Sequence, residues 1–225
     1  MTAMRTMKAL PLFPLPEVVL LPETLLPLHV FEPRYRDLLR DALEGDQLIG
    51  LQTIDPGADP GEGYAPPLLP IGCAGEVIEH SPLEDGRSNI VLKGTFRYRI
   101  VREIPGRSYR RADVLPLPVE PLPAGDPRTP GRRDLRRILS RLVDRLAVSV
   151  GREEARTLDP GLSDEALVNE ALSRLGLPAA DRYRILAMDR LFDRYAWALE
   201  HVVALQQRVD LLAPYWRQKI DPRSN

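Results

Sequence analysis

This 225-residue chain has one cysteine, Cys73, and therefore cannot form an internal disulfide. Free cysteines usually behave as small buried hydrophobes, so we expect Cys73 in a core strand. The chain also lacks a long apolar run, because Glu17, Glu23 and Glu32 interrupt its richest stretch. A membrane-spanning helix needs roughly 20 apolar residues. With no secretory signal in its first residues, the chain is expected to be cytoplasmic and to have no membrane partner.

The chain also has almost no net charge, because its 31 basic side chains nearly balance its 32 acidic ones. No global field therefore draws the chain to nucleic acid. Lysine is scarce, with three among the 31 basic residues, and none completes the phosphate-binding pattern G-x-x-x-x-G-K-[ST]. The nucleophile pattern G-x-S-x-G is missing too, and the three histidines show no metal-ligand spacing. We expect no catalytic residue, no cofactor and no metal.

Proline is abundant near the start, where short apolar runs give way to a helical pattern at Glu32-Pro33. Pro33 fits the first turn of a helix, where its missing N–H costs nothing. Apolar residues then recur at helical spacing: Tyr35, Leu38, Leu39, Ala42 and Leu43. This pattern predicts strands that lead directly into a short amphipathic helix, with Tyr35 in the core.

Five short runs with strand character follow, separated by turn residues. They cover 47–54, 71–79, 88–93, 95–103 and 109–115. Asp85-Gly86 is typical of a hairpin turn. In 95–103, apolar side chains alternate with arginines such as Arg97, which predicts a half-buried strand. Many short strands with tight turns favour a closed antiparallel barrel or a sandwich.

The pattern changes after 116–131, which holds six prolines and two glycines. Leucines at helical spacing begin at Leu135, and Ser163 is expected to cap a second helix. A long final pattern from Asp181 to about residue 213 predicts either one helix or two joined near Asp193, with Asp181 as its cap. Pro214 is expected to end or kink it.

The opening pattern PLFPL-x-x-VVL-x-P-x-x-x-LPLHVFEPRYRDL closely resembles the start of the Lon protease N-terminal domain family. Cys73–Val101, with its DGR turn and G-x-x-R element, supports the resemblance, and Asn169–Arg194 adds a weaker likeness. Together these segments span about residues 8–212. The resemblance implies an α+β fold, with a PUA-like antiparallel β-barrel and short helix followed by a C-terminal helical bundle. The corresponding division is a barrel at 8–118, a Pro/Gly linker at 119–131, a helical bundle at 132–213 and a tail at 214–225.

Seven residues of the family-like motifs are assigned structural roles by this resemblance: Phe31, Glu32, Pro33, Arg34, Tyr35, Gly94 and Arg97. Two interpretations of the polar members remain open. They form either a rim that docks a partner or a structural clasp in which Glu32 pairs with an arginine such as Arg97. The clasp is favoured because a polar group at a packed junction must be hydrogen-bonded.

Apolar side chains in two segments are candidate contacts for a partner: Tyr64, Leu68, Leu69, Tyr215 and Trp216. The 55–70 loop is too rich in proline to pair in a sheet, yet the apolar side chains at its tip are expected to be covered from water. That cover comes either from the domain itself or from a bound chain. Beyond Pro214, Tyr215 and Trp216 pose the same choice, since both residue types dominate interface hot spots.

The resemblance implies a non-catalytic protein- or peptide-binding module, which suggests an adaptor in bacterial protein quality control. Its expected partners are unfolded or specific protein segments, an ATP-dependent protease or chaperone, and a second copy of itself. One alternative is an RNA-binding accessory protein that uses the Arg132–Arg145 face, where Arg133, Arg137 and Arg141 recur every four residues. The other alternative is a hydrolase with an unrecognised site.

Overall fold

The computed structural model describes residues 5–57, 66–122, 132–149, 158–159 and 161–219, with side chains at all of these except 132, 146–149 and 213–219. The chain forms two compact units. The first unit comprises Met1–Val119 and Leu177–Asp189, and the second comprises Glu120–Gly176 and Arg190–Asn225. A segment near residue 180 therefore returns to the unit that begins the chain.

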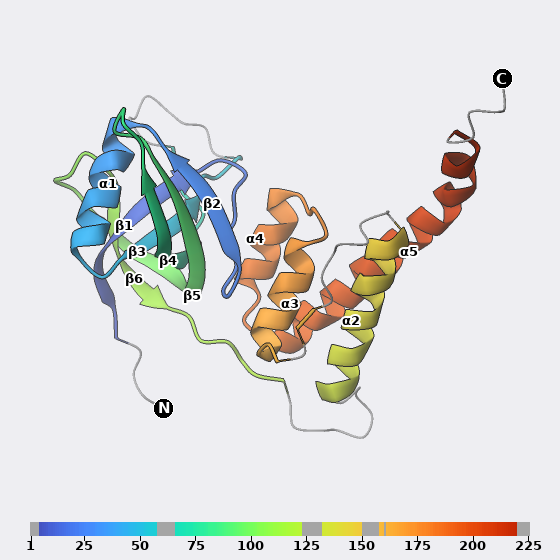
Figure 1. Ribbon diagram of the computed structural model, residues 1–225. Helices are drawn as coiled ribbons and strands as arrows, with labels where there is room; N and C mark the ends of the chain where they lie inside the picture. Colours follow the sequence, from blue (N-terminus) through green and yellow to red (C-terminus); the bar gives the residue numbers. More distant parts are fainter. Residues whose placement is uncertain (1–4, 58–65, 123–131, 150–157, 160, 220–225) are drawn as a thin grey trace. The chain divides into compact units, whose positions relative to one another are not determined.

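The first unit is built on a six-stranded sheet (Figure 1). The strands are β1 (Met7–Leu15), β2 (Leu25–Val30), β3 (Leu48–Thr53), β4 (Ile71–Pro82), β5 (Ser88–Ile104) and β6 (Arg111–Pro116). Their order is β2-β5-β4-β3-β1-β6, and a further β5–β6 pairing returns the sheet to β5. The first half of β5 pairs with β2 and its second half pairs with β6. Among the described strands, β2 has β5 as its single neighbour.

The expectation of a purely antiparallel sheet is wrong at one pairing. β1 runs parallel to β3, with Leu12 opposite Gly50 and Leu15 opposite Thr53. Parallel neighbours need a long crossover connection. Here β2 and helix α1 (Pro33–Glu44) separate the two strands along the chain and provide it.

The two runs at 88–93 and 95–103 form the single strand β5 rather than separate strands. Gly94 lies where they join. A side chain at Gly94 would collide with the backbone of Leu21, so only glycine admits this close approach. The amide of Gly94 donates to Thr24 O at 2.9 Å, and its carbonyl accepts from Glu23 N at 2.8 Å. Gly94 therefore joins the segment before β2 to β5.

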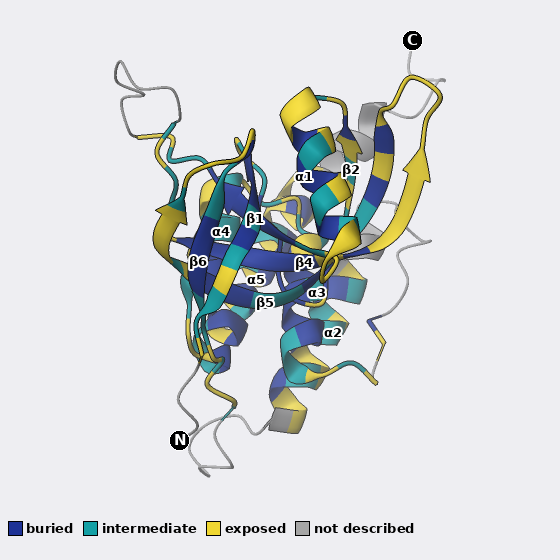
Figure 2. Ribbon diagram, turned by 90° about the vertical axis from the view of Figure 1, so that its left-hand side faces the viewer, coloured by how far each residue is buried: buried dark blue, intermediate teal, exposed yellow. Residues whose placement is uncertain are grey.

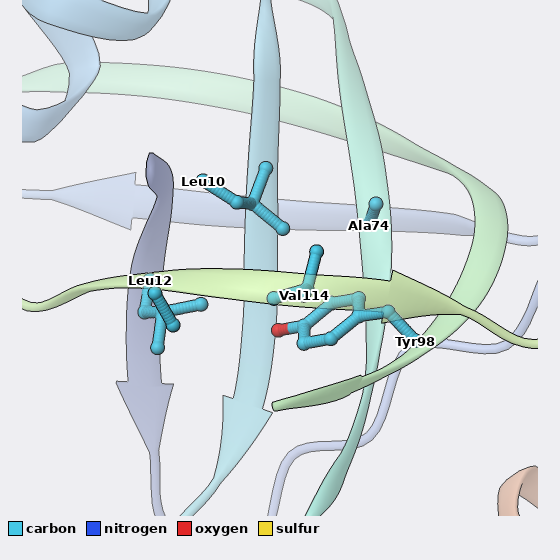
Figure 3. Packing of buried hydrophobic residues seen from close by; sticks show 6 residues of the cluster. Leu10, Leu12, Ala74, Tyr98 and Val114 are labelled. Carbon is cyan, nitrogen blue, oxygen red and sulfur yellow. The ribbon is translucent and has the colours of Figure 1, made fainter. Parts of the chain in front are cut away.

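The interior of the sheet holds a cluster centred on Tyr98 (Figure 3). Its members are Leu10, Leu12, Ala74, Tyr98, Ala112 and Val114. The Tyr98 hydroxyl donates to Gln52 Oε1 at 2.8 Å, and burial raises the pKa of this phenol well above its usual value. Gly50 and Gly72 leave room for the hydroxyl, since a Cβ at either would lie within 2.6 Å of it. Figure 2 shows β4 and β5 dark blue across the middle of the sheet.

Helix α1 matches its predicted position and buried stripe. Tyr35, Leu38, Leu39 and Ala42 are its buried residues, and α1 lies against β1, β2 and β3. The ring of Tyr35 packs on Phe13 with centroids 4.2 Å apart. Cys73 is fully buried in β4, as expected for a small hydrophobe.

The helices in the described part of the second unit are α2 (Arg132–Ser149), α3 (Asp164–Ser173) and α5 (Leu191–Lys219). α2 runs alongside α5, and both contact α3 (Figure 1). Ser163 caps α3, because its hydroxyl accepts from Ala166 N at 3.0 Å, as predicted. Arg194 is fully buried here and donates to Glu165 Oε1 at 2.8 Å.

The long final pattern forms two helices, one of the two alternatives that the sequence left open. The first of them, α4 (Ala179–Ala187), belongs to the first unit rather than to the predicted bundle at 132–213. Pro178, not Asp181, occupies the cap position of α4. The helix expected to end or kink at Pro214 continues to Lys219, so residues 214–219 extend α5 rather than starting a tail. Proline removes one helical hydrogen bond, and the helix continues past it.

Within the described ranges, no helix combines the length and apolarity needed to cross a bilayer.

Candidate functional site

The junction between β2 and α1 carries the polar residues of the opening motif. Glu32 occupies the N-cap position of α1 but makes no side-chain cap hydrogen bond. Its carboxylate pairs with Arg34 at 2.8 Å, and both side chains are more than a third exposed. The guanidinium of Arg34 also lies over the ring of Tyr35, 4.5 Å from its centroid. The Glu32–Arg97 clasp proposed from the sequence is therefore wrong, because Glu32 has a local, exposed partner.

Arg97 is buried in the first unit, where it holds α4. Its Nη1 donates to Leu186 O at 2.8 Å, at the end of α4. Its Nη2 donates to Pro118 O at 2.8 Å and to Asp189 Oδ1 at 3.0 Å. The side chain is 0% exposed, and its Nε has no acceptor among the described residues. The strand is half-buried as predicted, because Arg99 and Arg102 are exposed while Tyr98 is buried. Arg97 departs from the pattern because the end of α4 accepts one of its hydrogen bonds, which strand alternation could not reveal.

β2 and the residue after its end expose a row of mainly apolar side chains, which we call the β2 row: Leu25, Pro27, His29 and Phe31. Leu25 is 61% exposed and Phe31 is 57% exposed. The intervening Leu26 and Leu28 are half-buried, so β2 turns alternate side chains to opposite faces. The sheet therefore exposes an apolar row on β2, a strand that pairs with β5 along one of its two edges.

A shallow hollow of about 340 Å³ adjoins the β2 row. Pro27 and His29 line it from β2, together with residues of β4 and β5 such as Glu79 and Asn89. His29 Nδ1 lies 2.7 Å from Asn89 Oδ1, and its ring stacks on Phe31 at 5.9 Å. These contacts orient His29 at the surface. The hollow and the β2 row together form a surface with apolar area and a few polar groups.

The β2 row could not be recognised from the sequence. Residues 25–31 read LLPLHVF, a nearly continuous apolar run, and such a run is typical of a strand buried on both faces. No alternation of polar and apolar residues indicated which side would be exposed. Exposure of one face of a strand depends on which distant segment packs on that face, and the spacing of residues within the strand does not record this.

The described end of the 55–70 loop is attached to the sheet. Leu68 forms a bridge with Ile54 and packs against the Tyr98 cluster. The amide of Leu69 donates to Thr53 O at 3.0 Å, and Arg110 Nη1 donates to Pro66 O at 2.6 Å. These contacts favour the interpretation in which this part of the loop covers the domain's own core.

The other partner candidates lie where no side chain is described. Tyr64 falls outside the described residues, and the side chains of Tyr215 and Trp216 do as well. Partner binding by these residues, and by Leu68 and Leu69, stays a prediction.

The arginine face of α2 is partly neutralised. Arg137 pairs with Asp134 at 2.9 Å, and Arg145 lies 3.8 Å from Asp210. Arg136 is directed to α3, where it pairs with Asp164 at 2.7 Å. Arg133, Arg137 and Arg141 are exposed, and Arg132 has no described side chain. Among the described residues, no group of three or more His, Cys, Asp or Glu side chains could hold a metal ion.

Comparison with known proteins identifies the family. Residues 9–204 match the family described as the ATP-dependent protease La (LON) substrate-binding domain. Lon protease of Flavobacterium johnsoniae is 21% identical over 205 residues, which is 90% of this chain and 25% of that protein. Lon protease 2 of Myxococcus xanthus is 28% identical over 107 residues, which is 48% of this chain and 13% of that protein. The chain thus spans a quarter or less of the length of these two relatives.

Solved structures show the same fold. The N-terminal domain of a Mycobacterium avium complex Lon protease superposes with a TM-score of 0.61 at 14% identity, covering 87% of this chain and 98% of that one. A Lon N-terminal domain protein from Xanthomonas campestris gives a TM-score of 0.59 at 24% identity, covering 88% of this chain and 98% of that one. With the family match extending over most of its length, the chain belongs to the LON substrate-binding domain family.

Proposed function

We propose that this chain is a non-catalytic module that binds unfolded, apolar protein segments along the β2 row. The observation that carries the proposal is the exposure of Leu25 and Phe31, at 61% and 57%. They flank Pro27 and His29 of the same row, which line a hollow of about 340 Å³. A monomer gains nothing from leaving such side chains in water. Full burial of one contributes about 1.5–3 kcal/mol, so covering the exposed part of each contributes roughly half of that.

The edge position of β2 supports an extended ligand. Edge strands usually carry charges that discourage another strand from pairing, whereas residues 25–30 contain no Lys, Arg, Asp or Glu. Pro27 lacks an N–H and cannot donate to an added strand. A bound segment therefore depends on apolar contacts as well as on main-chain hydrogen bonds, which makes binding tolerant of sequence.

The comparisons support the finer parts of this proposal. The family's description as the substrate-binding domain of an ATP-dependent protease fits a protein ligand and association with a protease, and hence an adaptor role. The return of the strand pairings to β5 fits a PUA-like barrel, with α2, α3 and α5 as a small helical bundle. The single buried cysteine fits a reducing compartment such as the cytoplasm.

The test measures retention of reduced, alkylated α-lactalbumin, a permanently unfolded client, on immobilised protein. The double variant Leu25→Ser and Phe31→Ser should weaken binding about tenfold, since a loss of about 1.4 kcal/mol is tenfold. Its free energy of unfolding should change by about 0.5 kcal/mol or less, as for surface positions. The purified protein should neither hydrolyse ATP nor degrade casein.

The matched control is Leu211→Ser with Leu212→Ser on α5, where the leucines are 72% and 46% exposed. This variant should bind the client as the parent does. If both variants weaken client binding equally, or if neither weakens it, the β2 row is not the binding site. Steeply salt-dependent RNA retention would instead favour the arginine face, and reproducible ATP-stimulated proteolysis would refute a non-catalytic module.

A further inference from the structure

A second hollow of the first unit lies between α1 and the β4–β5 hairpin, and we call it the α1 pocket. Its volume is about 360 Å³, at the small end of ligand pockets. Its lining includes Arg36, Leu39, Leu43, Glu44, His80 and Ser88. None of them belongs to the β2 row, so the α1 pocket is a separate site.

The α1 pocket has an apolar floor and a polar wall. Leu39 and Leu43, one helical turn apart on α1, provide the floor, and Leu39 is buried. The wall comes from the hairpin, where His80 Nε2 lies 3.1 Å from Ser88 Oγ. His80 and Ser88 are therefore paired with each other, and the apolar lining beside them comes from Leu39 and Leu43.

Arg36 provides a cation whose charge is not neutralised locally. Two other arginines of α1 have carboxylate partners, because Arg34 pairs with Glu32 and Arg40 pairs with Asp37. Arg36 forms no ion pair with any residue that the structure describes, and its neighbour Asp37 is engaged by Arg40 and by Ser108 at 2.9 Å. The guanidinium of Arg36 occupies the space that a Cβ at Gly86 would fill. The hairpin turn therefore holds this charge at the α1 pocket.

The lining of the α1 pocket carries opposite charges at separate positions on α1. Arg36 and Glu44 are eight residues apart on α1, which corresponds to about 12 Å at 1.5 Å per residue. A carboxylate is favoured at the Arg36 end and disfavoured at the Glu44 end. The floor residue Leu39 is one turn from Arg36, so a fitting ligand carries an anion and an apolar group close together.

We propose that the α1 pocket binds the C-terminal carboxylate of protein chains that end in an apolar residue; this rests on the proposed function as a protein-segment binder. In a terminal residue, the carboxylate and the side chain are attached to the same Cα. In an extended internal segment, an acidic side chain and its apolar neighbour point to opposite faces. A chain end therefore places both groups into one small pocket more readily than an internal acidic residue does. Arg36 recognises the carboxylate, and Leu39 with Leu43 receives the last side chain.

The experiment uses the full chain and a fluorescent ten-residue peptide ending in Leu-Leu, with either a free carboxylate or a C-terminal amide. Fluorescence polarisation should give binding about tenfold weaker for the amide, in line with one charge-assisted hydrogen bond. Arg36→Gln should weaken binding of the free-acid peptide by a similar factor and leave binding of the amide peptide unchanged. The matched control Arg34→Gln, on the same helix but outside the α1 pocket, should affect neither peptide.

A third peptide, amidated but carrying one internal glutamate, separates the two carboxylate sources. Binding as tight as that of the free acid would mean that the α1 pocket takes acidic side chains, and would overturn the proposal. The proposal would also be overturned if Arg36→Gln weakened binding of the free-acid peptide and of the amide peptide equally. A failure here is distinguishable from failure of the proposed function, because retention of unfolded α-lactalbumin by the β2 row does not depend on Arg36.

Discussion

Two regions of the first unit depart from ordinary burial in opposite directions. In the sheet, Arg97 and Tyr98 are polar residues with 1% and 0% exposure. On the β2 row, Leu25 and Phe31 are apolar and more than half exposed. The buried polar groups donate to defined acceptors, Leu186 O and Gln52 Oε1 among them. Leu25 lies on β2, a strand with a single described neighbour strand, and Phe31 directly follows its end.

The difference separates stability from binding. A buried polar group is costly unless its hydrogen bonds are made, so the surroundings of Arg97 and Tyr98 tolerate few arrangements. An exposed apolar side chain constrains the fold little and gains free energy when a ligand covers it. Substitutions in the first region should therefore change stability, while those on the β2 row should change binding.

The largest effect is expected at Arg97. Arg97→Ala removes the donors to Leu186 O and Pro118 O and leaves a cavity, so unfolding free energy should fall by about 3–5 kcal/mol. Urea denaturation followed by circular dichroism measures it. Arg97→Met is the matched variant, because it keeps much of the volume while losing the hydrogen bonds, and its loss should be smaller. If Arg97→Ala lowers the free energy of unfolding by less than about 0.5 kcal/mol, the contacts of Arg97 with α4 contribute little to stability. The contrast between Arg97 and the β2 row would then be wrong.

A pH-dependent effect is expected at Asp113 in β6, where a carboxylate that is 1% exposed accepts from Lys8 at 3.0 Å and Arg102 at 2.9 Å. These contacts lower the pKa of Asp113 to about 2 from 3.8. The ionised form is favoured in the folded state, so its stabilisation is present above about pH 4 and is lost as the pH falls toward about 2. The stability difference between the parent and Asp113→Asn should shrink over that window.

The control for this titration is Asp46→Asn, at an exposed position outside the ion pairs that the structure describes. The same pH series on this variant shows how much of any change comes from replacing a carboxylate by an amide at the surface. A parent–Asp113→Asn difference that stays constant from pH 5 to 2 would contradict a carboxylate pKa of about 2.

The smallest effect is expected at Glu32, next to the β2 row. Its ion pair with Arg34 is exposed, and such pairs contribute about 0–1 kcal/mol. Glu32→Ala should therefore lower the unfolding free energy by about 0.5 kcal/mol or less. Thermal and urea unfolding measure it, with Arg34→Gln as the reciprocal variant. A loss above about 2 kcal/mol would mean that Glu32 has a buried partner and belongs with the Arg97 region.

Sequence patterns were sufficient where contacts are local. Pro33 and the apolar stripe predicted α1, Ser163 predicted the cap of α3, and Asp85-Gly86 predicted the turn between β4 and β5. The opening motif by itself also indicated the family, which the match over residues 9–204 confirms. In each local element, residues within a few positions of one another make the decisive contacts, and helical spacing, capping and turn geometry record these contacts directly.

Residues whose neighbours come from distant parts of the chain could not be placed in this way. Arg97 is buried because the segment near residue 189 returns to the sheet, 92 positions away, whereas Glu32 pairs with Arg34 and stays partly exposed. The β2 row is exposed, although its sequence is as apolar as that of a buried strand. Residue type and spacing record the propensity of a segment, whereas burial depends on which distant segment covers it.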